Sequence, residues 1–295
     1  MKIKTKAYIN LFFVVFFWGI TFPIQKLILN DSISPVFYNG VRFSISIIIL
    51  LIFKNYFKLN KLNKELWKKG LILGAFLSGG YLFQTWGLFY TSASKSGFIT
   101  ALYVGIVAIL SPVLEKKIPK KTQIISLLIS ITGLIFVTNP SLDFNVGDLL
   151  TLFCSFFYAF HIIYISIATK TISENEEKAL LLPQFIAVAV VNFLIIPLAP
   201  GKILLDYKVL SVAIFASIFP TIYAVSSQLK YQKHLGSVGS SLAYVGEPAF
   251  ALFSAMIILN EIPTKMETFG LIVMAFGMLL GTLSTPLEVE IRENN

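Results

Sequence analysis

A carboxylate interrupts one of the most apolar stretches of the sequence. In SLAYVGEPAFALFSAMIILNE, residues 241–261, Glu247 is followed directly by Pro248. A carboxyl group in apolar surroundings can take up and release a proton, or bind the amino group of a small solute. It can also stabilise the helical turn in which the proline removes a backbone hydrogen-bond donor. The sequence leaves all three roles open, and Glu247 is the first candidate site residue.

Three more ionisable residues, Lys26, Arg42 and His161, fall within apolar segments. Ionisable groups inside a membrane are rare and costly, so each is a candidate for function. Lys26 is either an anchor at the membrane surface, which a long side chain can reach, or a group that attracts a substrate carboxylate. Arg42 is expected to pair with backbone carbonyls or a loop carboxylate. His161 is either a proton relay or, as is more common for a lone histidine, a hydrogen-bonded packing residue.

Aromatic and amide side chains near the middle of apolar segments form the second group of candidates. They are Trp18, Gln84, Trp86, Tyr103, Tyr158, Tyr164 and Tyr244. Aromatic residues at this depth suit a cavity that accepts amphipathic or aromatic solutes. The competing interpretation is packing against lipid or other helices, because the chain has 27 Phe and 12 Tyr.

Motifs for hydrolysis, metal binding and nucleotide binding are missing. The sequence contains no H-E-x-x-H, G-x-S-x-G or G-x-x-x-x-G-K-[ST] pattern. It has two histidines and one cysteine, Cys154, so neither a thiol metal cluster nor an intrachain disulfide is expected. We therefore expect no cofactor, no bound metal and no enzymatic activity.

The elements that must position these residues are membrane helices. Of the 295 residues, 56% are hydrophobic and 13% charged, and the mean hydropathy is +0.79, which is far from the composition of soluble domains. The net charge of +9 does not indicate nucleic-acid binding, because the lysines form short runs between apolar blocks. The first apolar stretch is too long for a signal peptide and no small-x-small cleavage site follows, so we expect a retained helix.

A spanning helix needs about 20 mainly apolar residues, and ten segments qualify. They are 8–29, 36–53, 71–90, 96–114, 122–138, 146–168, 180–198, 209–228, 237–259 and 266–285. Eighteen of the 24 Lys and Arg residues fall in the N-terminus, the tail and the connections on one side, against four on the other. By the positive-inside rule both termini face the cytoplasm.

The sequence also contains an internal repeat. Matching pairs in the same order are Tyr103-Val104-Gly105 with Tyr244-Val245-Gly246, Ile118-Pro119 with Ile262-Pro263, Gly133 with Gly277, Thr138 with Thr282 and, more weakly, FFWGITF from Phe16 with FFYAFHI from Phe156. They predict two five-helix halves, residues 1–140 and 141–295. Consecutive repeats with an odd number of crossings have opposite orientations, as in many secondary transporters. Glu247 takes the position of Ile106, so its charge belongs to one half only.

Several segments resemble the EamA family of the drug/metabolite transporter superfamily. They are FWGITFPIQK with Ser34-Pro35 and Arg42, GLFYTSASKSGFITALYV, GDLLTLFCSFFYAF and EPAFALFSAMIILNE, and the similarity covers nearly the whole chain. The resemblance implies ten helices in two inverted repeats, a central cavity between the halves, and export of amino acids or related metabolites. One departure is that Ala108 stands where many first halves carry proline, and the proline is at Pro112.

We therefore expect an all-α polytopic membrane protein that acts as a secondary carrier of a small organic metabolite by alternating access, in the cytoplasmic membrane. A channel is the nearest alternative, disfavoured because no ring of charges or filter-like loop is present. A structural or sensory membrane protein is a third possibility. The expected partners are a small-molecule substrate and the lipid bilayer, with protons as a further candidate and no nucleic acid. The chain is expected to be a monomer or a homodimer.

Overall fold

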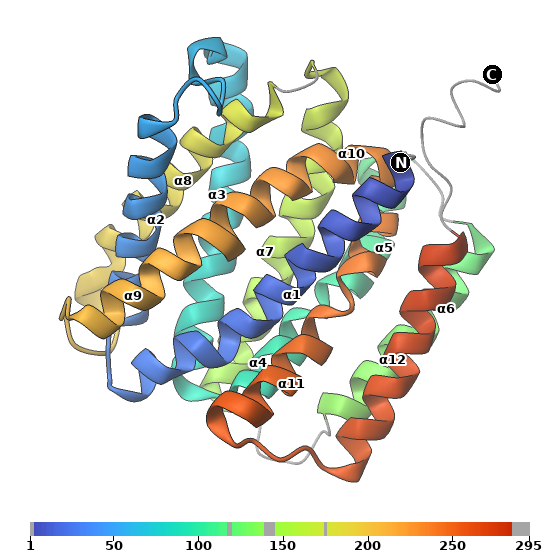
Figure 1. Ribbon diagram of the computed structural model, residues 1–295. Helices are drawn as coiled ribbons and strands as arrows, with labels where there is room; N and C mark the ends of the chain where they lie inside the picture. The colour runs from blue at the N-terminus through green and yellow to red at the C-terminus, as the bar shows by residue number, and fades with distance from the viewer. Residues whose placement is uncertain (1–2, 117–119, 139–144, 174–175, 285–295) are drawn as a thin grey trace.

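The computed structural model describes residues 3–116, 120–138, 145–173 and 176–284, which form helices joined by short connections (Figure 1). Within these residues the only β-type pairing is an isolated bridge between Ile33 and Lys202. The α-helices are α1 (Ile3–Asn30), α2 (Pro35–Ile52), α3 (Lys64–Tyr90), α4 (Ala93–Thr100), α5 (Tyr103–Leu114), α6 (Lys121–Thr138), α7 (Val146–Ala168), α8 (Leu181–Ile195), α9 (Tyr207–Ala216), α10 (Ala224–Tyr244), α11 (Glu247–Leu259) and α12 (Lys265–Ser284). Short 3₁₀ turns are η1 (Leu59–Lys61), η2 (Thr169–Thr171), η3 (Glu177–Leu180) and η4 (Ile196–Leu198), and η5 (Ser217–Tyr223) is a π-helix.

Seven helical stretches of the described residues are long and apolar enough to cross a membrane. They are Thr5–Asn30, Pro35–Ile52, Lys64–Tyr90, Ala93–Leu114, Val146–Thr171, Glu177–Leu198 and Tyr207–Leu259. The last is 53 residues long and contains two expected spans, 209–228 and 237–259. Helices α6 and α12 lie at the expected spans 122–138 and 266–285 but are not among the seven, and residue 285 lies outside the described part. The chain is a multi-pass membrane protein, and the count of ten spans stays a prediction.

The outer surface of the bundle is apolar. Among its most exposed side chains are Ile109 and Val113 at 73%, Leu194 at 72% and Leu198 at 74%. In water such a surface would favour aggregation, whereas lipid tails are as apolar as these side chains. Many polar side chains of the helices, by contrast, are buried in the interior, among them Asn39, Thr85, Thr151 and Gln184. This distribution suits a bilayer as the solvent.

Two of the expected spans, 96–114 and 237–259, are not single continuous helices. The first is divided into α4 and α5 at Ala101 and Leu102, and the second is interrupted between α10 and α11. Glu247 and Pro248 occupy the first turn of α11. There a proline has no hydrogen bond to lose, and a carboxylate favours the positive end of the helix dipole. Pro248 thus begins a helix and does not bend one.

The expected span 209–228 is also extended beyond its predicted end. Helix α9 passes through η5 into α10, which continues to Tyr244. Pro220 lies inside η5, and the wider π turn accommodates a residue that cannot donate a backbone hydrogen bond. At Gly236 the backbone leaves helical geometry with φ at 72°, which glycine adopts without steric cost. The loop predicted after residue 228 is therefore a helix with a kink at Gly236.

Helices from distant parts of the chain pack side by side around a common interior. Helix α3 packs on α7 and α8, α1 on α10 and α11, and α2 on α8. Figure 1 shows α6 and α12 side by side at one edge of the bundle, where their main contact is with each other. Buried apolar side chains form three clusters between these helices. The other helices bring most of the predicted polar site residues together.

Candidate functional site

A cavity lies inside the bundle between α1, α2, α3, α5, α7, η5, α10 and α11. It encloses roughly 590 Å³ of free space, part of which is open solvent. Its polar lining includes Gln25, Arg42, Gln84, His161, Gln228 and Glu247. Its aromatic lining is Trp18, Phe22, Tyr81, Tyr103 and Tyr158. Apolar walls with a few placed polar groups suit a small organic solute.

Glu247 lies at the cavity wall, at the start of α11, and is 4% exposed. The Tyr103 hydroxyl donates a hydrogen bond of 3.2 Å to its Oε2 atom. Tyr103 itself is the first residue of α5, so the starts of the two half-helices meet through this bond. Among the described residues no Lys, Arg or His lies within ion-pair distance of Glu247.

Arg42 lines the same cavity from α2 and is 1% exposed. Its Nε donates to the Thr221 hydroxyl at 2.7 Å, and its Nη2 donates to the Tyr81 hydroxyl at 3.3 Å. The guanidinium carbon also lies 4.7 Å from the centre of the Tyr81 ring. The sequence predicted backbone carbonyls or a loop carboxylate as partners, but the side-chain partners are neutral hydroxyls and an aromatic ring.

The remaining predicted residues of the cavity are joined by short hydrogen bonds. Tyr158 donates to Oε1 of Gln84 at 3.0 Å, and Nε1 of Trp18 donates to the Pro220 carbonyl at 3.1 Å. Nε2 of His161 is hydrogen-bonded to Oε1 of Gln184, also at 3.0 Å. His161 thus has the buried partner expected of a packing residue while it also lines the cavity.

Four of the residues singled out from the sequence do not line the cavity: Trp86, Lys26, Tyr164 and Tyr244. Trp86 is only partly buried on α3. Lys26 donates from Nζ to the carbonyls of Leu88 and Phe89 at 2.8 and 3.3 Å, so it binds the end of α3. Tyr244 is fully buried behind Trp18, with ring centres 5.2 Å apart.

The cavity also contains residues that the sequence reasoning missed, among them Thr21, Gln25, Tyr81 and Gln228. Part of this set was predictable. Trp18, Thr21 and Gln25 recur every three or four residues, the spacing that places side chains on one face of a helix. Tyr81 and Gln84 are related in the same way. The same spacing therefore predicts that Thr21 and Gln25 share the helix face of Trp18, and that Tyr81 shares the face of Gln84.

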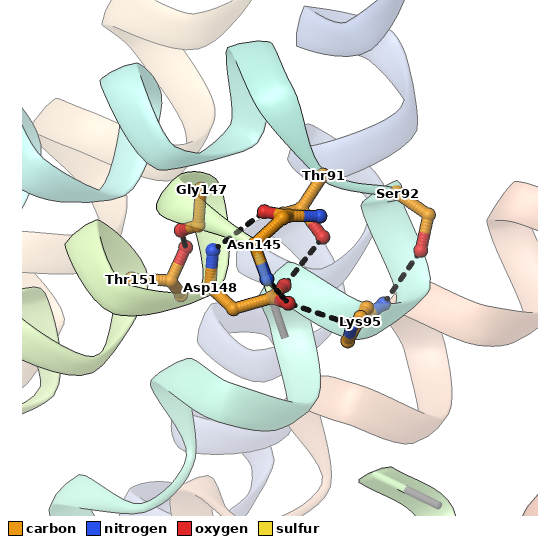
Figure 2. Close-up of polar contacts among 7 residues, drawn as sticks. All are labelled: Thr91, Ser92, Lys95, Asn145, Gly147, Asp148 and Thr151. Carbon is orange, nitrogen blue, oxygen red and sulfur yellow. Dashed lines mark hydrogen bonds and ion pairs between the residues drawn. The ribbon is translucent and has the colours of Figure 1, made fainter. Parts of the chain in front are cut away.

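A buried ion pair fastens one end of the bundle (Figure 2). The Asp148 carboxylate, which is fully buried, lies 2.6 Å from Nζ of Lys95. It also accepts hydrogen bonds from the Thr91 hydroxyl at 2.7 Å and from the Asn145 backbone nitrogen at 2.9 Å. Asn145 in turn caps α7 by accepting from the Asp148 nitrogen. The group ties the α3–α4 connection to the start of α7.

Two hydrogen bonds between a glutamate and a serine lie at the two ends of the segment formed by α4 and α5, one at the start of α4 and one at the end of α5. After α11, Glu261 accepts from the backbone nitrogens of Ala93 and Ser94 at 3.2 Å each, and from the Ser94 hydroxyl. Beyond α5, Glu115 accepts from the Ser237 hydroxyl of α10, and Lys170 lies 4.0 Å from it. Glu261 thus binds the start of α4.

Metal ligands do not gather in the described residues, where no three His, Cys, Asp or Glu side chains are close enough to hold an ion. Cys154 is buried, with its Sγ 3.5 Å from the Thr100 hydroxyl. The cavity combines a buried carboxylate, a buried guanidinium and several amide groups between aromatic walls.

Comparisons with known proteins place this site in a family. The sequence profile of the EamA-like transporter family matches residues 5–139 and again residues 145–283. A relative from Archaeoglobus fulgidus, described as an uncharacterized transporter, is 30% identical over 283 residues, covering 96% of this chain and 86% of the relative. A protein crystal structure aligns with a TM-score of 0.74 at 13% identity, over 95% of this chain and 98% of that chain, which shows a shared fold. The two profile matches cover almost all of the sequence, so the chain belongs to the EamA-like transporter family and is a membrane transporter.

Proposed function

We propose that the protein is a secondary carrier that exports a small organic metabolite, an amino acid or a related compound, across the cytoplasmic membrane by alternating access. The observation that carries the proposal is the cavity. Its walls are formed by residues from both of the matched ranges, 5–139 and 145–283. They include Glu247, which is buried and has no ion-pair partner among the described residues. Secondary transporters hold their substrates between two repeats, near the bilayer midplane.

The proposed architecture has ten spans in two inverted five-helix repeats, residues 1–140 and 141–295, with both termini in the cytoplasm. Contacts between matching positions support it. Gly133 and Gly277 lie at the crossing of α6 and α12, where a β-carbon on either would come within 3 Å of the other helix's backbone. Trp18 and Tyr158, which also match, both line the cavity. Equivalent residues that meet in this way are expected of a pseudo-two-fold arrangement.

The contacts of Glu261 and Glu115 support alternating access. Each joins a residue of one proposed repeat to the start of a helix segment in the other, and the two contacts lie at opposite ends of the bundle. In the proposed cycle one contact breaks while the other holds, so that the cavity opens to one side of the membrane at a time. Polar contacts of this kind can be exchanged without disturbing the apolar packing inside each repeat.

Glu247 has two proposed transport roles, binding of the substrate's amino group and uptake of a proton. Its place in the first turn of α11 also gives it a local structural role, since a carboxylate there stabilises the helix start. The structural role alone would be expected in both repeats, but the matching residue of the first repeat is Ile106. This asymmetry favours an added role in transport.

Counterflow in liposomes tests the carrier proposal. Liposomes that contain the purified protein are loaded with one unlabelled amino acid and diluted into medium with a trace of the same amino acid in radiolabelled form. A carrier accumulates label transiently above equilibrium, whereas a channel lets label equilibrate without an overshoot. A structural or sensory protein would move no label. If only sugars or amines gave an overshoot, the carrier proposal would stand and the assignment of amino acids as substrates would be wrong.

The variant Glu247→Gln separates the roles of the carboxylate. A glutamine keeps an acceptor for the Tyr103 hydroxyl, so the variant should fold, while loss of the charge should lower counterflow by about tenfold or more, the cost of one charge-assisted hydrogen bond. Glu267→Gln, which alters a carboxylate at the exposed start of α12, is the matched control. Normal counterflow in a folded Glu247→Gln protein would leave only the structural role.

A further inference from the structure

Arg42 is the second charge in the cavity, and the proposed function gives it no role. The residue is 1% exposed and lines the cavity together with Glu247. Among the described residues no carboxylate lies within ion-pair distance of its guanidinium. A buried cation without a counter-charge is costly, and inside a membrane it usually marks a substrate or ion site.

We propose that Arg42 is the binding group for a carboxylate of the transported solute. The inference rests on the proposed carrier function, because it concerns the same cavity. It makes Arg42 and Glu247 two ends of one site, the first for an anionic group and the second for a cationic group. The substrate class is then a small zwitterion.

The hydrogen bonds of the guanidinium leave room for such a ligand. An arginine has five N–H groups. The Nε group is bonded to Thr221 and one group of Nη2 to Tyr81. Nη1 is buried and has no hydrogen-bond partner in the described part of the chain. A carboxylate accepts from two guanidinium nitrogens at once, which is the strongest pairing available to this side chain.

The guanidinium is held in place before any ligand arrives. The Thr221 hydroxyl that accepts from Nε donates its own hydrogen to the Ala216 carbonyl at 2.7 Å. The Ser217 hydroxyl binds the Arg42 carbonyl, also at 2.7 Å. Both hydroxyls belong to η5, and π-helical turns are frequent at functional sites. Preorganisation of this kind reduces the entropy lost on binding.

A purely structural arginine is the competing explanation. The Arg42 guanidinium interacts with the buried Tyr38 hydroxyl electrostatically and through a side-chain contact, but neither that hydroxyl nor Nη1 makes a hydrogen bond of good geometry among the described residues. The aromatic rings of Phe43 and Tyr81 also contact the cation, at 5.6 and 4.7 Å. Ring contacts satisfy part of the charge but no N–H group, so they do not replace an anion. The two explanations differ in whether Arg42 changes ligand selectivity.

Fluorescence of Trp18 gives a binding assay that does not depend on transport. The chain has three tryptophans, and of these only Trp18 lines the cavity. The double variant Trp67→Phe/Trp86→Phe therefore reports on the cavity alone. The probes are the twenty L-amino acids and, for each that changes the emission, its amide, its decarboxylated amine and its deaminated acid. L-leucine, L-leucinamide, 3-methylbutylamine and 4-methylpentanoate form one such set.

Selectivity in the otherwise unchanged protein is the first result. If Arg42 binds a carboxylate, the amino acid binds about ten- to a hundredfold more tightly than its amide or amine, as expected for a charge-assisted pair. Equal affinity for the acid, the amide and the amine overturns the inference. A failure of every carboxylate compound to change the emission overturns it as well.

Substitution of Arg42 is the second result. Arg42→Gln should remove the preference for the acid over the amide, and Arg42→Lys should keep part of it because the charge remains. Lys26→Gln removes a partly buried cation that lies outside the cavity lining and should leave the preference unchanged. If Arg42→Gln does not fold, Thr221→Val tests the same point, since it releases the guanidinium and should weaken acid binding severalfold. A retained preference in a folded Arg42→Gln protein refutes the proposal.

The outcomes separate this inference from the carrier proposal. If counterflow is saturable but equally fast for amino acids and their amides, the carrier proposal stands and the proposal that Arg42 binds a carboxylate is overturned. Acid-selective binding without any counterflow supports the carboxylate site and contradicts the carrier.

Discussion

The contact between Glu261 and the start of α4 offers the sharpest test of how the two repeats are joined. The Glu261 carboxylate accepts from the backbone nitrogens of Ala93 and Ser94 and from the Ser94 hydroxyl. In Glu261→Gln the charge is lost and one carboxylate oxygen becomes a donor nitrogen, so only one oxygen can still accept from these groups and the bonds that remain are weaker. We predict that Glu261→Gln and Ser94→Ala each destabilise the protein and that their effects are not additive.

The magnitude follows from the bonds that are lost. A hydrogen bond to a charged group contributes about 1.5–3 kcal/mol, and a carboxylate near a helix N-terminus adds about 0.3–1 kcal/mol. Glu261 is partly exposed, so solvent screening reduces both contributions. We expect Glu261→Gln to lower the free energy of unfolding by about 1–3 kcal/mol and Ser94→Ala by about 1 kcal/mol. The double variant should lose less than the sum of the two single losses, with a coupling of up to about 1 kcal/mol.

The assay is denaturant unfolding of the purified protein and the three variants in one detergent. Glu267→Gln serves as the control, because the Glu267 carboxylate accepts from the Thr264 nitrogen beside its own helix. Its effect should add to that of Ser94→Ala. Losses for Glu261→Gln and Ser94→Ala that add to within about 0.5 kcal/mol would show that the two groups do not act together, and would refute the reasoning.

Three further predictions use the same measurement together with counterflow. Glu115→Gln should destabilise the opposite end of the bundle by about 1–3 kcal/mol, since its contact with Ser237 is lost; unchanged stability would contradict this. Gly19→Ala should lower the free energy of unfolding by about 1–3 kcal/mol and slow transport, because the added β-carbon would lie 2.8 Å from two backbone atoms of α11. Gly105→Ala is the control. There the nearest atom is the end of a flexible side chain at 3.1 Å, and the cost should be under about 1 kcal/mol. Lys95→Met should cost about 1–3 kcal/mol, less than a fully buried pair because the lysine is 25% exposed, and adding Asp148→Asn should recover part of it.

Residue chemistry made the ionisable groups of the cavity visible in the sequence. Polar and ionisable groups are rare in apolar segments, so Arg42, Gln84, His161 and Glu247 stand out without any structure, and all four line the cavity. Their partners were not predictable, because no spacing rule connects Arg42 on α2 with Thr221 on η5. Such pairs depend on which helices pack together, and that is decided by the whole bundle.

The helix breaks were hidden for a different reason. The first lies at Ala101 and Leu102, two good helix formers, with no glycine or proline at the break itself. Local preferences there favour a continuous helix, so packing against α7 and α11 must outweigh them. The second break is marked by Gly246 and Pro248. Proline in the first turn of a helix is a known start signal, but the length of the apolar run around Pro248 predicts one continuous helix with the proline in its interior.

The two breaks explain how a cavity with few charged side chains can be polar. A helix that begins inside the bundle presents backbone N–H groups without partners in their own helix. Helices α5 and α11 both begin at the cavity, with Tyr103 and Glu247 as their first residues, and these two side chains are bonded to each other. The N-terminal ends of two helices, one from each repeat, therefore lie at the cavity, while Glu247 supplies a negative charge from one repeat only.

The charge of Glu247 in one repeat does not by itself explain the proposed export. A bound solute can shift the balance between two conformations only by the difference in its affinity for them. Placing Glu247 in one repeat makes the two faces of the cavity chemically unequal, so the inward-open and outward-open forms can differ in affinity and in rate. Net direction still requires a gradient of the solute or of a coupled ion. Export by this protein would therefore have to come from a high internal concentration of its substrate or from protons, and counterflow with and without an imposed pH difference distinguishes the two.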